Sequence, residues 1–174
     1  MKKAFILFLV LSLSLFLVYF FLKKSSVPDF DKLEKTLYDR RIIHPNQNSW
    51  KETYTEDVEF DKVNIKLFTV ENVAKAKLFT SGILKFEIDI NIEDSKKLVQ
   101  ILNDSASYVW NELGTAEFDK KIVFYDNSNK VIGLTQIDFD NQQTYSEPHS
   151  RTMKWGNLSG RGQKVLFEIL NKYL

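Results

Sequence analysis

The stretch Ile83-Leu-Lys-Phe-Glu-Ile-Asp-Ile-Asn-Ile92 alternates apolar and polar residues from Leu84 onward. Successive side chains of a β-strand point to opposite faces, so this alternation predicts a strand with one face on a core and the other in water. Half-buried strands of this kind are typical of antiparallel sheets. We therefore expect an antiparallel sheet at the centre of the fold.

The segments on either side predict further strands and three helices. Apolar residues at helical spacing predict helices over residues 28–39, 94–103 and 159–173, with Asp94 or Ser95 capping the second and Ser159 the third. Strands are expected at residues 50–54, 58–60, 62–70, 121–126, 130–139 and 152–155, with a hairpin turn at 127–129 and a loop at 140–150. The links between strands are too short for parallel crossovers. Residues 28–174 are thus expected to form one α+β domain with helices packed on one face of a mostly antiparallel sheet.

The N-terminal segment Ala4–Leu22 contains nineteen residues and no charge, and lysines flank it at positions 2, 3, 23 and 24. As a helix it would be roughly 28 Å long, close to the hydrocarbon thickness of a bilayer of about 30 Å. Ser12 and Ser14 can bond back to their own helix. Residues 1–24 are therefore predicted to be a single-pass membrane anchor, followed by a juxtamembrane linker at residues 25–27.

Two other interpretations of this segment fit its residues less well. A cleaved secretory signal has a shorter apolar region and small residues before its cleavage site, whereas Tyr19, Phe20 and Phe21 stand there. A buried helix of a soluble protein would have polar positions on one side. Lysines are more numerous after the segment than before it, which favours a cytoplasmic domain, but long domains translocate largely regardless of charge. We expect the domain on the exported side, periplasmic or extracellular.

Composition excludes several classes of protein. The chain's 24 basic and 23 acidic residues give +1, and removing the four flanking lysines leaves 20 against 23, a net charge of −3. A nucleic-acid binder would show a basic excess, so we expect no nucleic-acid partner. The absence of cysteine excludes disulfides, lipoprotein anchoring and thiolate metal sites.

One cluster of residues has the composition of an anion site. Ser159, Gly160, Arg161 and Gly162 stand at the predicted start of the last helix. Backbone N–H groups at a helix start, together with a guanidinium group, can bind phosphate, sulfate or carboxylate. The P-loop spacing is absent, and the alternative is a plain helix cap after a tight turn.

A second candidate is an aromatic recognition surface formed by Trp50, Tyr145 and Trp155. The alternative is that these rings close the edges of the core. Carboxylates offer a possible enzymatic site, with Glu87 and Asp89 in one predicted strand, Asp138 near the end of another and Asp140 just after it. Their simpler interpretation is the solvated face of a sheet.

The only imidazoles, His44 and His149, stand in no metal-binding or catalytic motif. We therefore assign no catalytic residue, no metal ligand and no cofactor from the sequence.

The C-terminal segments Ile122-Val-Phe-Tyr-Asp126, Val131-Ile-Gly-Leu-Thr-Gln-Ile-Asp-Phe139 and Met153-Lys-Trp-Gly-Asn-Leu-Ser159 resemble small uncharacterised bacterial proteins that are secreted or membrane-tethered. Those proteins share a terminal hairpin, a loop, a Leu-Ser turn and a closing helix, and many have cysteines around the hairpin, which this chain lacks. The resemblance implies the same domain class and assigns no site residue.

Together these patterns predict a membrane-anchored, non-catalytic module that binds a protein of the cell envelope or a small ligand. An immunity-like inhibitor belongs to the same class. The alternative is an envelope hydrolase or metal-dependent enzyme that uses the carboxylates named above, one of which would then be desolvated in a cleft.

Overall fold

The computed structural model describes residues 2–25, 27–38, 72–81, 87–110, 114–149, 153–154 and 156–174. The chain divides into two units, Met1–Phe30 and Asp31–Leu174. The strands predicted between residues 50 and 70 lie outside the described residues.

The first unit consists of one long helix, α1 (Lys2–Ser25). Its described side chains, residues 5–19, are all exposed. Ser12 and Ser14 donate their hydroxyls to the carbonyl oxygens of Leu9 and Leu11 at 2.9 and 2.8 Å, which confirms the predicted bonding back to the helix. Among the residues described, no helix is both long enough and apolar enough to cross a bilayer, so the anchor stays a prediction.

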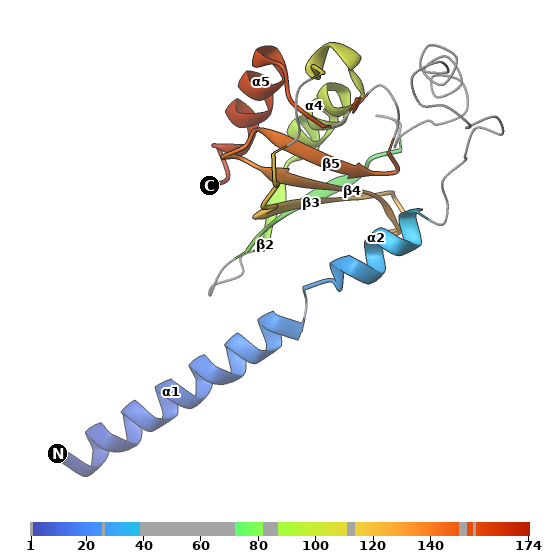
Figure 1. Cartoon of the computed structure of the whole chain (residues 1–174). Coiled ribbons are helices and arrows are strands. Elements are labelled where there is room, and N and C mark those ends of the chain that lie inside the picture. Colours follow the sequence, from blue (N-terminus) through green and yellow to red (C-terminus); the bar gives the residue numbers. More distant parts are fainter. Residues whose placement is uncertain are drawn as a thin grey trace. The chain divides into compact units, whose positions relative to one another are not determined.

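The second unit is built on a five-stranded sheet (Figure 1). Its strands are β1 (Lys75–Thr80), β2 (Glu87–Ile90), β3 (Lys120–Tyr125), β4 (Val131–Asp138) and β5 (Gln143–Glu147). They lie in the order β2-β1-β3-β4-β5, and every neighbouring pair is antiparallel. The α+β class and the antiparallel sheet are thus confirmed. In β2 the exposed Asp89 and the buried Ile90 follow the predicted alternation.

The hairpin between β3 and β4 forms where the sequence predicts it. Asp126 fixes the turn because its Oδ1 accepts hydrogen bonds from the backbone N–H groups of Ser128 and Lys130 at 2.8 and 2.9 Å. Asn129 adopts a φ of 60°, a conformation that asparagine tolerates better than most residues.

Two predictions for the C-terminal third are wrong. The expected loop at residues 140–150 contains β5, whose residues are mostly polar on both faces and therefore show no hydrophobic alternation. The buried hydroxyls of Thr135 and Ser146, 2.9 Å apart, bond across β4 and β5. The expected strand at 152–155 is a turn at its two described residues, Met153 and Lys154, and Lys154 has a φ of 51°.

The described helices of this unit are α2 (Phe30–Tyr38), α4 (Ile92–Asn103) and α5 (Gly160–Leu170), with a 3₁₀ turn at Ser105–Ser107. Ser159 caps α5 as predicted. The cap of α4 is Asn91 and not Asp94 or Ser95, since the Oδ1 of Asn91 accepts the N–H of Asp94 at 2.8 Å.

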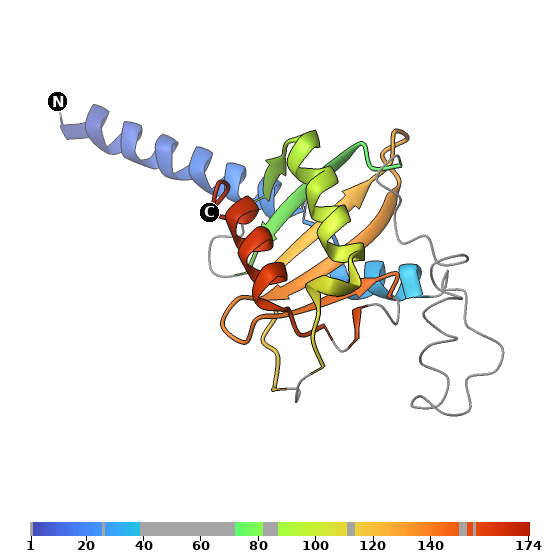
Figure 2. The same cartoon turned by 90° about the horizontal axis from the view of Figure 1, so that it is seen from above.

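Helices α4 and α5 cover one face of the sheet (Figure 2). Their apolar stripes meet the inward side chains of β1, β2, β3 and β4, and this contact forms the core. Its fully buried apolar members on these elements include Ala76, Leu78, Leu98, Val99, Ile122, Phe124, Ile137, Leu166 and Leu170.

The opposite face of the sheet is covered as well. Six consecutive residues of β4, from Gly133 to Asp138, are buried, and neighbouring residues in a strand face opposite sides. On this second face the side-chain amide of Gln136 donates to Glu34 of α2 at 2.9 Å. Figure 1 shows α2 on the side of the sheet opposite to α4 and α5. The prediction of helices on one face therefore holds for α4 and α5 and is wrong for α2.

The burial of Leu37 gives a test of this second layer. Leu37 is 3% exposed, so Leu37→Ala removes buried apolar contacts and should lower the free energy of unfolding by about 2–3 kcal/mol. Lys35→Ala changes an exposed position of the same helix and should have an effect of about 0.5 kcal/mol or less. Urea denaturation followed by tryptophan fluorescence measures both, and equal stability of the two variants would contradict the packing of α2 on the sheet.

Candidate functional site

The four residues of the predicted anion site lie at the start of α5. The Ser159 hydroxyl accepts the N–H of Gly162 at 3.1 Å and donates to the carbonyl oxygen of Ala106 at 2.8 Å. The guanidinium of Arg161 lies 3.3 Å from the carboxylate of Asp104. Side chains of this segment thus already bond to the protein, and anion binding here stays a prediction.

Gly162 has a clear structural role at this helix start. A Cβ atom on Gly162 would lie 2.3 Å from the carbonyl oxygen of Ser107, whereas a Cβ atom on Gly160 would meet nothing within 4 Å. Only a residue without a side chain lets α5 approach the 3₁₀ turn this closely. The two glycines of the segment therefore differ in what they do.

The predicted aromatic surface is described only in part. Trp50 and Trp155 lie outside the described residues. The Tyr145 hydroxyl donates to Oε1 of the buried Glu147 at 2.6 Å, and its ring stacks on His149 with ring centres 5.8 Å apart. Tyr145 therefore belongs to a local cluster at the end of β5.

The four candidate carboxylates do not converge. Glu87 and Asp89 lie on β2, and Lys77 binds Glu87. Asp138 lies on β4, which is three strands away and hence roughly 14 Å distant at the usual strand spacing. The side chain of Asp89 is 82% exposed and Asp140 is exposed. Glu87 and Asp89 both form ion pairs with Lys77, and the structure does not bring this pair together with Asp138.

Asp138 is the buried member of this group. Burial raises the pKa of Asp138, but hydrogen bonds from Asn141 and from the backbone of Glu117 outweigh that effect and hold the pKa below its ordinary value. Its oxygens accept the N–H of Glu117 at 2.7 Å and the N–H and side-chain amide of Asn141 at 2.9 and 2.8 Å. The carboxylate thus ties the segment before β3 to the turn after β4.

A groove of about 410 Å³ runs between α4 and α5. The two helices are antiparallel, because Asp94 near the start of α4 contacts Lys172 just beyond α5, and Asp104 beyond α4 contacts Arg161 at the start of α5. We call this feature the helical groove. It is lined by Lys97, Gln100, Ile101 and Asp104 on the α4 side and by Arg161, Val165, Glu168, Ile169 and Lys172 on the α5 side.

The helical groove combines an apolar floor with charged walls. Ile101 and Ile169 are 8% and 4% exposed, while the side chains of Lys97, Arg161 and Lys172 are 57%, 67% and 54% exposed. An apolar strip flanked by charges suits another amphipathic surface better than a small polar substrate. None of the residues assigned to a site from the sequence lines the groove except Arg161.

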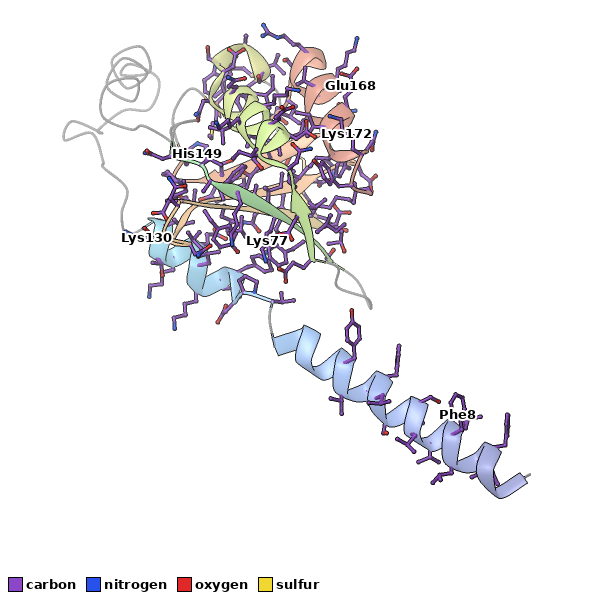
Figure 3. All side chains as sticks on the ribbon, turned by 180° about the vertical axis from the view of Figure 1, so that it is seen from behind. Phe8, Lys77, Lys130, His149, Glu168 and Lys172 are labelled. Carbon is purple, nitrogen blue, oxygen red and sulfur yellow. The ribbon has the colours of Figure 1, made fainter. Side chains whose placement is uncertain are left out.

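The sequence contains part of the pattern from which the helical groove could be predicted. The positions 97, 100, 101 and 104 recur at helical spacing, as do 161, 165, 168, 169 and 172. The missing information was that the two helices lie side by side and antiparallel, which depends on contacts between residues far apart in the chain. Figure 3 labels two of these side chains, Glu168 on α5 and Lys172 just beyond that helix.

Lys172, one of the residues that line the helical groove, bonds to the buried carboxylate of Asp94. Lys172 donates to its two oxygens at 2.9 and 3.1 Å, and the Tyr173 hydroxyl donates at 2.9 Å. The side-chain amide of Asn91 adds a fourth bond at 3.0 Å. This set of bonds, the Asp94 clamp, joins the start of α4 to the end of α5.

Gly162→Ala and Gly160→Ala form a matched pair of variants. The first places a Cβ atom against the backbone of Ser107 and should destabilise the protein by about 1–3 kcal/mol. The second faces open space and should change stability by less than about 0.5 kcal/mol. Thermal and urea denaturation of both variants measure the difference, and equal stabilities would refute the close approach of α5.

The Asp94 clamp should make stability depend on pH. Hydrogen bonding from Lys172 lowers the pKa of Asp94 and outweighs the raising effect of burial. A carboxyl with a lowered folded-state pKa stabilises the fold fully above the ordinary range near 4, and loses that contribution as the pH falls through the lowered value. Asp94→Asn should therefore cost about 1–3 kcal/mol at pH 7 and reduce the loss of stability on acidification.

Urea denaturation between about pH 7 and pH 3 tests this expectation. Asp89→Asn is the control, because Asp89 is an exposed partner in an ion pair with Lys77 at 3.8 Å and should contribute little. If the free energy of unfolding of Asp94→Asn changes with pH in the same way as that of the unchanged protein, the Asp94 carboxylate does not contribute to the pH dependence.

Comparison with known proteins adds no assignment to this site. In the described ranges no cluster of histidine, aspartate and glutamate is arranged to hold a metal ion. No family model, no curated protein and no solved structure matches this chain.

Proposed function

We propose that this protein is a single-pass membrane protein whose α+β domain binds another protein through the helical groove, without catalysis, on the exported side of the membrane. The observation that carries the proposal is the groove itself, with its apolar floor and exposed charged walls. A groove between two helices can receive the apolar face of an amphipathic helix from a partner.

The proposed anchor is Ala4–Leu22. Its support is the uncharged run of nineteen residues, bounded on both sides by paired lysines. The side chains of α1 from Phe5 to Tyr19 are apolar apart from two serines and a tyrosine hydroxyl, and they are exposed on every side of the helix. An apolar surface of this kind is favourable in lipid and costly in water.

The envelope enzyme is a weaker proposal. Its candidate carboxylates lie on β2 (Glu87 and Asp89), at the end of β4 (Asp138) and in the turn after β4 (Asp140), and none of them lines the helical groove. Asp138, the one that is buried, is engaged by three hydrogen bonds from neighbouring segments. A binding role requires no such convergence.

Site-specific photocrosslinking of the full chain in cells tests the proposal. A photoreactive amino acid at Gln100, an exposed residue of the groove, should give one discrete adduct in the membrane fraction. The same amino acid at Ser128, in the exposed β3–β4 turn, should give none. A chain recovered only in the soluble fraction, or equal labelling from both positions, would overturn the proposal.

A further inference from the structure

The turn that follows α5 forms part of the helical groove. The helix ends at Leu170, and residues 171–173 form a turn in which Lys172 lines the groove. The backbone ties this turn to α5, because the N–H of Lys172 donates to Ile169 at 3.3 Å and the N–H of Tyr173 donates to Leu170 at 2.9 Å. These bonds fix the backbone of the turn but not the direction of its side chains.

The direction of those side chains is set by Asp94, which does not itself line the groove. Its side chain is 4% exposed, and its two oxygens accept the Lys172 ammonium at 2.9 and 3.1 Å and the Tyr173 hydroxyl at 2.9 Å. The Tyr173 hydroxyl also accepts the backbone N–H of Asn91 at 3.2 Å. Hydrogen bonds to a charged, buried acceptor are stronger than those made in water. One carboxylate therefore holds two consecutive side chains of the turn against the start of α4.

The opposite end of the groove is held by a weaker contact. Arg161 pairs with Asp104 at 3.3 Å, and their side chains are 67% and 35% exposed. Exposed ion pairs contribute little to holding two side chains in one geometry. The buried carboxylate thus has its effect at one end of the groove, which makes the other end an internal reference.

We infer that Asp94 is a positioning residue of the helical groove: without touching the occupant, its carboxylate holds the turn after α5 on α4 and keeps that end of the groove in its binding form. The inference rests on the proposed function and adds the residue that controls the site. When an amide replaces the carboxylate, the Lys172 ammonium loses its anion and the turn can leave α4. The binding form then exists for only part of the time, and the apparent affinity falls by that fraction.

Distances between spin labels test the positioning without any partner. The chain has no cysteine, so introduced cysteines are labelled selectively. One pair at the exposed Lys96 and Asn171 reports on the Asp94 end, and a second pair at the exposed Ser105 and Lys164 reports on the other end. In the full chain in detergent micelles, Asp94→Asn should broaden the distance distribution of the first pair about twofold, through local opening, and leave the second unchanged. An unchanged distribution for the first pair would overturn the inference.

Substitutions of Lys172 test the same contact from its other side. Lys172→Met keeps a linear side chain without the ammonium, and should broaden the first distribution as Asp94→Asn does. Lys172→Arg keeps a cation with donors for both oxygens, and should leave the distribution narrow. A narrow distribution in Lys172→Met would contradict the role assigned to the contact.

Photocrosslinking from Gln100 measures the consequence for binding. Asp94→Asn should lower the yield of the adduct about fivefold, since the binding form of the groove becomes the minor one. Leu37→Ala is the control, because it removes buried contacts on the other face of the sheet and lowers stability without changing the groove. Its adduct yield should stay the same. Equal losses in the two variants would show that lowered stability alone reduces the yield, and would refute the inference.

The two proposals fail in different ways. If Gln100 captures a partner equally well in the unchanged chain and in Asp94→Asn, the binding function stands and the positioning role is wrong. If Gln100 captures nothing in the unchanged chain, the binding function is wrong, and the inference falls with it even where the spin labels show that Asp94 holds the turn.

Discussion

The constraint on which the domain depends is that β4 is buried on both of its faces. If helices covered only one face of the sheet, every second residue of a strand would face water. The six consecutive buried residues of β4 therefore require cover on both faces. The pair α4 and α5 covers one face, and Glu34 of α2 bonds to Gln136 on the other. With the sheet fixed between these layers, α4 and α5 are held side by side, and the helical groove is the seam between them.

The ends of that seam are tied by charged groups and its middle by apolar ones. The Asp94 clamp holds one end, and the pair Arg161–Asp104 holds the other. The buried carboxylate at the first end is stabilised because it accepts hydrogen bonds from the Lys172 ammonium, the Tyr173 hydroxyl and the Asn91 amide. The pair at the second end is exposed and contributes less. The two ends of the groove are therefore stabilised to different extents.

The sequence predicts well what depends on local pattern. The hairpin at residues 120–138 and the cap at Ser159 need only neighbouring residues, and both form as expected. It fails for β5, a strand of mostly polar residues whose hydroxyls bond across the sheet. It also fails for the second layer, because the alternating residues that the structure describes as a strand, Glu87–Ile90, form only β2, at one edge of the described sheet. The helical groove needs contacts such as Asp94 with Tyr173, 79 residues apart, which no local pattern contains.

That separation has a consequence for the order in which the domain folds. Translation produces all five described strands and α4 before α5, so the inner surface of α4 has no helix beside it until the last segment emerges. During that interval the buried side chains of Leu98 and Leu102 lack their final neighbours. Loop closure over so many residues is slow compared with hairpin formation. Until α5 can pack on α4, the chain therefore exposes apolar surface that favours aggregation and chaperone binding.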